Sequence, residues 1–417
     1  MGCFSRSSSA SAKGPCVACC QGAQARDDQL SQASEARIAV LTGQTGPAGR
    51  ADPPATAQGS PSGRLNSDCA QEARTLAPVV ARFDRYRQAL PSARAAADLN
   101  ELGDKPGSEP SAKPCLTRLP ADADQLGAAL GMQAGTLQDT DLRNDETGFR
   151  AALYRDEGTG KMILVGRDTQ PDSLVDWQAN TRNGLGVDTP QYLAMRDLTK
   201  KLAANDQAFD IAGYSKGGGL AQEAGLVNSL AQVQLFNSAG MPDAALARTG
   251  QPSFDSLVSR TQAFSSEGDF LTFMNTTTDP GQNIINSRFL RRELAGQGPG
   301  INPIDIKVRN PAMRGIDDPD FEGDKQSYLA ELDQQIDSMQ TAYDTGGSVA
   351  TFPPVRAASK ETVADSMTLA GKVLGARSDQ PTLGKLAQHK MGVVLDAMES
   401  DVASDRKSIS EFMLKCG

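Results

Sequence analysis

The strongest constraint on the fold comes from the stretch GYSKGGGLAQ at residues 213–222, which follows the short apolar run FDIA. It contains a GxSxG motif, with Ser215 between Gly213 and Gly217, and it opens an apolar helical pattern. A serine between a strand and a helix occupies a sharp turn, and its neighbours two positions away must lack a Cβ so that strand and helix can pass closely. The stretch therefore predicts an α/β unit that lifts the Ser215 hydroxyl above the edge of a sheet.

Two other kinds of glycine-rich loop are excluded by the order of the residues. A phosphate-binding P-loop requires GxxxxGK[ST], whereas here the lysine precedes the glycines. A dinucleotide-binding loop requires GxGxxG, which GYSKGGG does not supply. We therefore interpret the turn as a nucleophile elbow, in which the amide of Lys216, at the start of the helix, donates to a developing oxyanion.

Strand-like and helical patterns alternate around the elbow. Runs at 149–155 and 161–167 flank the turn EGTG and predict a hairpin, and further strands are expected at 209–213, 231–238 and 261–266. Helical patterns lie between them, one of them opened by Thr189 as the cap and Pro190 at the first helical position. Alternation of this kind predicts a mostly parallel sheet that is covered on both faces.

The composition narrows the classes of function. The net charge of −9 argues against a nucleic-acid partner, and no run of about 18 apolar residues predicts a membrane span. The chain has one histidine, His389, so any histidine-dependent mechanism must use it and a multi-histidine metal site is excluded. The acidic run at 317–324 lacks the EF-hand spacing. We expect neither a metal nor a cofactor.

The sequence pattern divides the chain into three parts. Residues 1–70 are rich in Ser, Ala, Gly, Gln and Pro, and we expect them to be a disordered tail. Residues 71–135 carry apolar residues at helical spacing and predict a helical segment. Residues 136–417 would then form the catalytic domain, with a helical cap at about 276–380.

The cysteines are concentrated at the N-terminus. Four of the seven lie within the first twenty residues, which does not suggest a disulfide-stapled secreted domain. Gly2 is a candidate for myristoylation and Cys3 for palmitoylation, since two acyl chains anchor a protein stably. Arg6 stands where the usual motif has Ser or Thr, so a plain Ser-rich export tail is the alternative interpretation.

The region around the hairpin resembles the class 3 lipase family of α/β hydrolases. The carrying residues are the turn Gly166-Arg167-Asp168-Thr169 after the second hairpin strand, the pair Asp176-Trp177, and the elbow itself, which is similar to the GHSKGG variant of bacterial lipase-like proteins. The resemblance implies an α/β-hydrolase fold, a serine esterase activity on lipid esters, and Thr169 as the second oxyanion donor. The sequence departs from the family at Gly166, where Phe is usual, and at Asp168, where Gly is usual.

The resemblance also assigns the other members of a catalytic triad. Gly268-Asp269 follows a predicted strand as the family's acid does, which favours Asp269 over Asp243, a residue that lies one strand too early. His389 follows both residues in the order Ser, Asp, His. The expected constellation is therefore Ser215, Asp269 and His389.

These features predict a lipase or phospholipase that acts through an acyl-enzyme at a membrane surface. The tail and the acylation motif resemble those of bacterial type III effectors, which implies secretion into a host cell; the bacterial cytoplasm is the alternative location. Two other functions stay open: an inactive lipase-like membrane adaptor, and an acyltransferase on the same fold.

Overall fold

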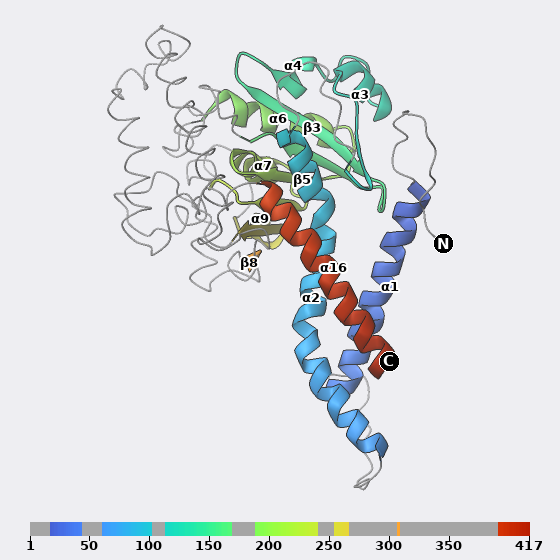
Figure 1. The fold of residues 1–417 in the computed structure, drawn as a ribbon. Coiled ribbons are helices and arrows are strands. Elements are labelled where there is room, and N and C mark those ends of the chain that lie inside the picture. The colour runs from blue at the N-terminus through green and yellow to red at the C-terminus, as the bar shows by residue number, and fades with distance from the viewer. Residues whose placement is uncertain are drawn as a thin grey trace, which may run out of the picture.

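The protein combines a sheet domain with three long helices that extend from it (Figure 1). The computed structural model describes residues 17–43, 61–101, 113–168, 188–240, 254–266, 307–308 and 391–417. Across these ranges, none of the helices has both the length and the apolar composition needed to cross a bilayer.

The sheet is mixed but mostly parallel. Its strands are β1 (Leu116–Arg118), β2 (Arg143–Asn144), β3 (Phe149–Asp156), β4 (Met162–Gly166), β5 (Phe209–Tyr214), β6 (Val233–Phe236), β7 (Thr261–Ser266) and β8 (Lys307–Val308). The order is β1-β3-β4-β5-β6-β7-β8, with β2 paired to β3. β3 is antiparallel to β1, β2 and β4, and β4 to β8 run parallel. The predicted hairpin and the mostly parallel sheet are thus confirmed.

Helices cover both faces of the sheet. The helices among the described residues are α1 (Val17–Thr42), α2 (Pro61–Glu101), α3 (Ala123–Ala129), α4 (Asp139–Leu142), α6 (Pro190–Ala203), α7 (Lys216–Val227), α9 (Phe254–Ser259) and α16 (Met391–Cys416). In β4, Ile163 and Val165 join the core under α2 and α16, whereas Leu164 joins the core under α6 and α7. In β5, Ala212 and Ile211 divide in the same way. Because strand side chains alternate between faces, each strand supplies both cores.

The N-terminus of α6 follows the sequence prediction. Thr189 has an extended backbone and its hydroxyl accepts a hydrogen bond from the amide of Tyr192, while Pro190 occupies the first helical position. This cap fixes where α6 begins, beside the helix that follows the elbow.

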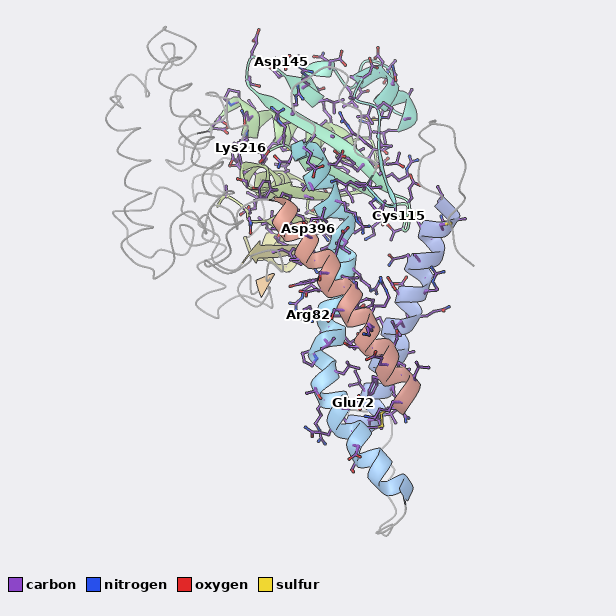
Figure 2. All side chains as sticks on the ribbon, viewed as in Figure 1. Glu72, Arg82, Cys115, Asp145, Lys216 and Asp396 are labelled. Carbon is purple, nitrogen blue, oxygen red and sulfur yellow. A yellow bond between two sulfur atoms is a disulfide. The ribbon has the colours of Figure 1, made fainter. Side chains whose placement is uncertain are left out.

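The helices α1, α2 and α16 pack side by side into a bundle, here called the stalk, that projects beyond the sheet (Figure 1). Phe83 of α2 is fully buried in it, and the guanidinium groups of Arg87 and Arg406 lie over its ring at 5.8 Å. The carboxylate of Asp405 on α16 accepts two hydrogen bonds, at 2.9 and 2.5 Å, from Arg82 on α2, which is labelled in Figure 2. Aromatic and charge-assisted contacts therefore join α2 to α16.

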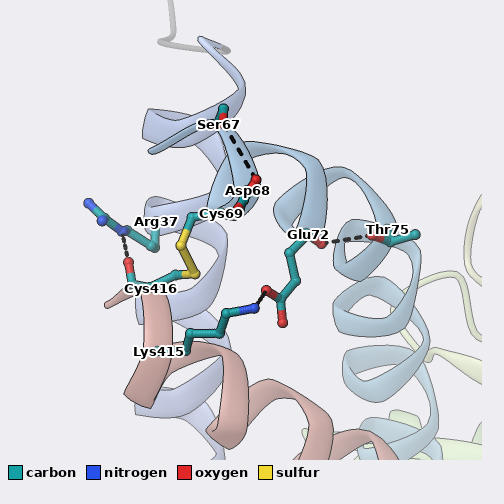
Figure 3. Close-up of a disulfide and its surroundings, with 8 residues drawn as sticks. All are labelled: Arg37, Ser67, Asp68, Cys69, Glu72, Thr75, Lys415 and Cys416. Carbon is teal, nitrogen blue, oxygen red and sulfur yellow. Dashed lines mark hydrogen bonds and ion pairs between the residues drawn. A yellow bond between two sulfur atoms is a disulfide. The ribbon is translucent and has the colours of Figure 1, made fainter. Parts of the chain in front are cut away.

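Two disulfides fasten the stalk, one at each end. Cys20 of α1 is bonded to Cys115, just before β1, and Cys69 of α2 is bonded to Cys416, at the end of α16. Figure 3 shows the second bond beside an ion pair of 2.5 Å between Lys415 and Glu72. The expectation that the cysteines form no disulfide framework is therefore wrong. The pairs are 95 and 347 residues apart in sequence, so their partnership depends on the fold.

The predicted division of the N-terminal third is also corrected. Residues 1–70 contain α1 and the beginning of α2, and the segment 71–135 contains β1, which pairs with β3 and belongs to the sheet. The sequence pattern did not predict the helix α1, because two of its buried positions are Ser31 and Ser34 rather than apolar residues. The Ser31 hydroxyl donates to Asp84 of α2 at 2.5 Å. The packed face of α1 thus mixes hydrogen-bonded serines with a few apolar residues, among them Ile38.

Candidate active site

Ser215 lies between the end of β5 and the start of α7 in a strained backbone conformation. Its φ is 52° and its ψ is −122°, which lies far from the left-handed helical region that some non-glycine residues tolerate. The surroundings hold it there. The Ser215 amide donates to Phe236 at 3.1 Å, and its carbonyl accepts from the amides of Gly218 at 3.0 Å and Ala239 at 2.8 Å. Strain that is enforced by several contacts is characteristic of functional turns.

The glycines on either side of Ser215 are required by close backbone approach. A Cβ on Gly213 would lie 2.0 Å from the carbonyl oxygen of Gly217, so the strand and the helix leave no room for a side chain. A Cβ on Gly217 would lie 2.3 Å from the carbonyl oxygen of Gly166, at the end of β4. The glycine pattern seen in the sequence therefore has the steric cause expected of an elbow.

Lys216 is the first residue of α7, and its side chain is buried (Figure 2). Its amide belongs to the first turn of the helix, where the helix dipole is positive. An oxyanion that develops next to Ser215 would meet this amide. The geometry thus places a potential hydrogen-bond donor directly after the serine.

The loop after β6 supports the elbow from the next strand. The side-chain amide of Gln222 on α7 donates to the Ser238 hydroxyl at 3.0 Å and to the Ala239 carbonyl at 2.8 Å. The Ser238 hydroxyl in turn donates to the Ala239 carbonyl at 2.7 Å. A Cβ on Gly218 would lie 2.2 Å from the Ser238 hydroxyl oxygen, so helix and loop are in close contact. The first turn of α7 is consequently fixed on the sheet.

A buried ion-pair network connects α7 to α6. Arg196 of α6 contacts Glu223 of α7, whose side chain is fully buried, and makes two hydrogen bonds to Asp188 at 2.6 and 3.2 Å. Burial alone would lower the pKa of Arg196, but the hydrogen bonds and charges of Asp188 and Glu223 raise it above its ordinary value. Nothing in the spacing of these residues along the sequence indicates that they meet. The Arg196–Glu223 contact joins the elbow helix α7 to α6.

The end of β4 lies against the elbow. The Arg167 amide donates to the Arg150 carbonyl of β3 at 2.9 Å, which continues the hairpin pairing beyond the strand. Asp168 is 8% exposed, so its carboxylate is buried next to the turn that the sequence predicts to supply an oxyanion donor. The parallel pairing of Gly166 with Gly213 puts the ends of β4 and β5, and with them Asp168 and Ser215, at the same edge of the sheet.

The other predicted site residues lie outside the described residues. They are Thr169, Asp269, His389, Gly2 and Cys3, together with the alternative acid Asp243 and the pair Asp176-Trp177.

Comparisons with known proteins agree on one kind of enzyme. Residues 111–297 match the family model of a Tle-like phospholipase domain. The chain is also 28% identical over 205 residues to an extracellular phospholipase A1 of Serratia liquefaciens, an alignment that covers 48% of this chain and 58% of the relative. The chain thus spans somewhat more than half of that relative's length. The matched region begins before β1, in agreement with the place of β1 in the sheet. The part of the chain that contains the elbow is thus similar to phospholipase domains, and both matches support a lipase- or phospholipase-like family.

Proposed function

We propose that the protein hydrolyses an acyl ester of a phospholipid, with Ser215 as the nucleophile. The observation that carries the proposal is the backbone of Ser215, which is strained between β5 and α7 and enclosed by glycines that cannot be replaced without collision. Strain at a serine on a strand–helix turn is the hallmark of the nucleophile elbow of α/β hydrolases. The phospholipase-like domain and the phospholipase A1 relative support the substrate class.

In the proposed mechanism, the Ser215 hydroxyl attacks the acyl carbonyl and gives its proton to His389. The bond to the lysophospholipid oxygen then breaks, and that oxygen takes the proton from His389 as it leaves. Water, deprotonated by His389, releases the fatty acid and restores the serine. Asp269 orients the imidazole, and the amides of Lys216 and Thr169 stabilise the tetrahedral oxyanion. The proposal includes an α/β-hydrolase fold with a helical cap at about 276–380.

The experiment uses phospholipids that carry different acyl chains at the two glycerol positions, presented as mixed micelles or vesicles. The wild-type protein should release fatty acid, and Ser215→Ala should lose at least about a thousandfold in kcat, because the nucleophile is absent. Ser229→Ala is the matched control, since Ser229 is exposed beyond the end of α7. Equal release by wild type and Ser215→Ala would refute the nucleophile.

The identity of the released chain assigns the position of cleavage. Release of the chain at the first glycerol position would agree with the phospholipase A1 named for the relative. Transfer of the chain to an added alcohol would indicate an acyltransferase that uses the same acyl-enzyme. Absence of turnover on every ester would favour the inactive adaptor. His389→Ala and Asp269→Asn, measured beside Ser215→Ala, test the remaining members of the triad.

We also propose that the protein acts outside the cell that makes it. Disulfides persist in oxidising compartments, and the two that fasten the stalk argue against the bacterial cytoplasm as the site of action. The relative is named an extracellular enzyme. Delivery into a host cell, with acylation of Gly2 and Cys3 there, is a separate proposal. Labelling with a myristate analogue in eukaryotic cells tests it, and an unlabelled wild-type chain would refute it.

A further inference from the structure

The end of α2 contacts Asp168, which lies two positions after Gly166, the last residue of β4. Asn100 is the second-last residue of α2, and its side-chain amide faces both carboxylate oxygens of Asp168. With the amide oriented so that its nitrogen faces the carboxylate, the two distances are 2.6 and 2.8 Å. The opposite orientation would set the amide oxygen against two acceptors, so the nitrogen must be the donor. The contact is a charge-assisted hydrogen bond.

Asn100 is itself held in place by the stalk and the sheet. Two residues earlier, the buried carboxylate of Asp98 accepts a hydrogen bond of 2.9 Å from the Tyr154 hydroxyl of β3. One turn earlier again, Arg94 donates to Glu399 of α16 at 2.9 Å and to the carbonyl of Pro114 at 3.2 Å. The last turns of α2 therefore lie across β4 and β5 in a fixed position (Figure 1).

The Asp168 contact matters because of the peptide bond that follows it. The amide proposed as the second oxyanion donor, that of Thr169, belongs to the planar peptide unit that begins at the Asp168 Cα. The residues before it are anchored by the Arg167 amide on β3 and by the close approach of Gly166 to the elbow. A hydrogen bond to the Asp168 side chain also restrains the Asp168 Cα, from which this peptide unit begins. It also draws the carboxylate towards α2.

We propose that Asn100 is a positioning residue for catalysis, which aligns the oxyanion turn by holding Asp168 from the stalk. The inference rests on the proposed ester hydrolysis. It also gives Asp168 a defined position, since a carboxylate next to an oxyanion hole opposes the developing charge and the hydrogen bond holds this carboxylate towards α2. The stalk then contributes to the active site through one side chain, in addition to its packing against the sheet.

Two substitutions remove the contact in different ways. Asn100→Ala leaves Asp168 without this donor, and Asn100→Asp sets two carboxylates against each other. We expect kcat to fall about tenfold in Asn100→Ala and about a hundredfold in Asn100→Asp, with KM nearly unchanged, because oxyanion contacts form in the transition state. Asn205→Asp is the control, since it makes the same change of charge at a half-buried amide that donates to the Lys201 carbonyl at the end of α6.

The decisive variant exchanges the two partners. Asn100→Asp combined with Asp168→Asn restores an amide facing a carboxylate, and we expect it to recover at least about tenfold of the kcat lost in Asn100→Asp. Recovery, with kcat rather than KM affected in the single variants, would support the positioning role. An unchanged kcat in Asn100→Asp, or no recovery in the exchanged pair, would overturn it.

Wild type and Ser215→Ala are measured in the same assay, so that the two proposals fail separately. If these two proteins hydrolyse the lipid equally, or not at all, the hydrolase proposal fails and the positioning role fails with it. If wild type is active and Ser215→Ala is not, the Asn100 variants alone decide. Circular dichroism of each variant shows whether it is folded. If Asn100→Asp is not folded, the kcat of Asn100→Ala tests the positioning role.

Discussion

Replacing Ser215 with glycine should abolish hydrolysis and also stabilise the folded protein. The serine has a φ of 52° and a ψ of −122°, and a non-glycine residue held in so sparsely populated a region costs about 1–3 kcal/mol. Glycine adopts the conformation without that penalty. It loses more backbone entropy on folding than other residues, which costs about 0.5–1 kcal/mol.

The comparison that isolates the strain is Ser215→Gly against Ser215→Ala. Both variants lack the hydroxyl, so its contacts cancel, and only alanine keeps the strain. The difference of the two terms leaves glycine more stable than alanine by about 1 kcal/mol. Chemical denaturation under oxidising conditions, followed by circular dichroism, measures this as a difference in the free energy of unfolding.

A second pair of variants at an unstrained serine provides the control. Ser229 is exposed and is not among the described non-glycine residues with positive φ. There glycine should be less stable than alanine by about 0.5–1 kcal/mol, the reverse of the order at Ser215. If alanine were also the more stable residue at position 215, the turn would not be strained, and the main structural argument for a nucleophile would fail.

Three other predictions concern the stalk, the elbow and the pH dependence of stability. Replacing Cys69 and Cys416 by serine should lower the free energy of unfolding by about 2–5 kcal/mol, because the bond closes a very long loop. A reducing agent should destabilise the wild type but have less effect on this variant. Equal stability of the wild type and the variant would contradict this prediction. Gly217→Ala should reduce kcat about a hundredfold, because its methyl would collide with a backbone carbonyl and displace the elbow, whereas Gly127→Ala, which meets no atom within 4 Å, should leave kcat unchanged. Burial raises the pKa of Asp98 above 3.8 despite a hydrogen bond that lowers it. The native state therefore retains this proton to higher pH than the unfolded state does. The contribution of Asp98 to stability falls as the pH rises from the unfolded pKa through the folded pKa. Asp98→Asn should therefore unfold at higher denaturant concentration than wild type at neutral pH, with the advantage shrinking below about pH 4, and an advantage that grew on acidification would refute this sign.

The cysteine pairing and the ion pairs show why part of the structure could not be predicted from sequence. The strand, the turn and the helix of the elbow lie within about twenty consecutive residues. The spacing of apolar residues and the positions of glycines in the sequence therefore predict this local structure directly. Contacts such as that between Arg196 and Glu223 join different elements. Their formation depends on which helices become neighbours, and neither residue type nor spacing encodes that.

The sequence by itself determined the order of the strands and helices around Ser215, because backbone sterics demand glycine wherever a strand and a helix meet so closely. It also predicted the hairpin of β3 and β4 and the cap of α6, which are equally local. Only the tertiary structure decided that α1, α2 and α16 form a disulfide-fastened stalk, and that Asn100 from this stalk meets Asp168 beside the elbow. The buried face of α1 includes Ser31, whose partner Asp84 lies on another helix, so the physical reason for its folding appears only when the helices are assembled.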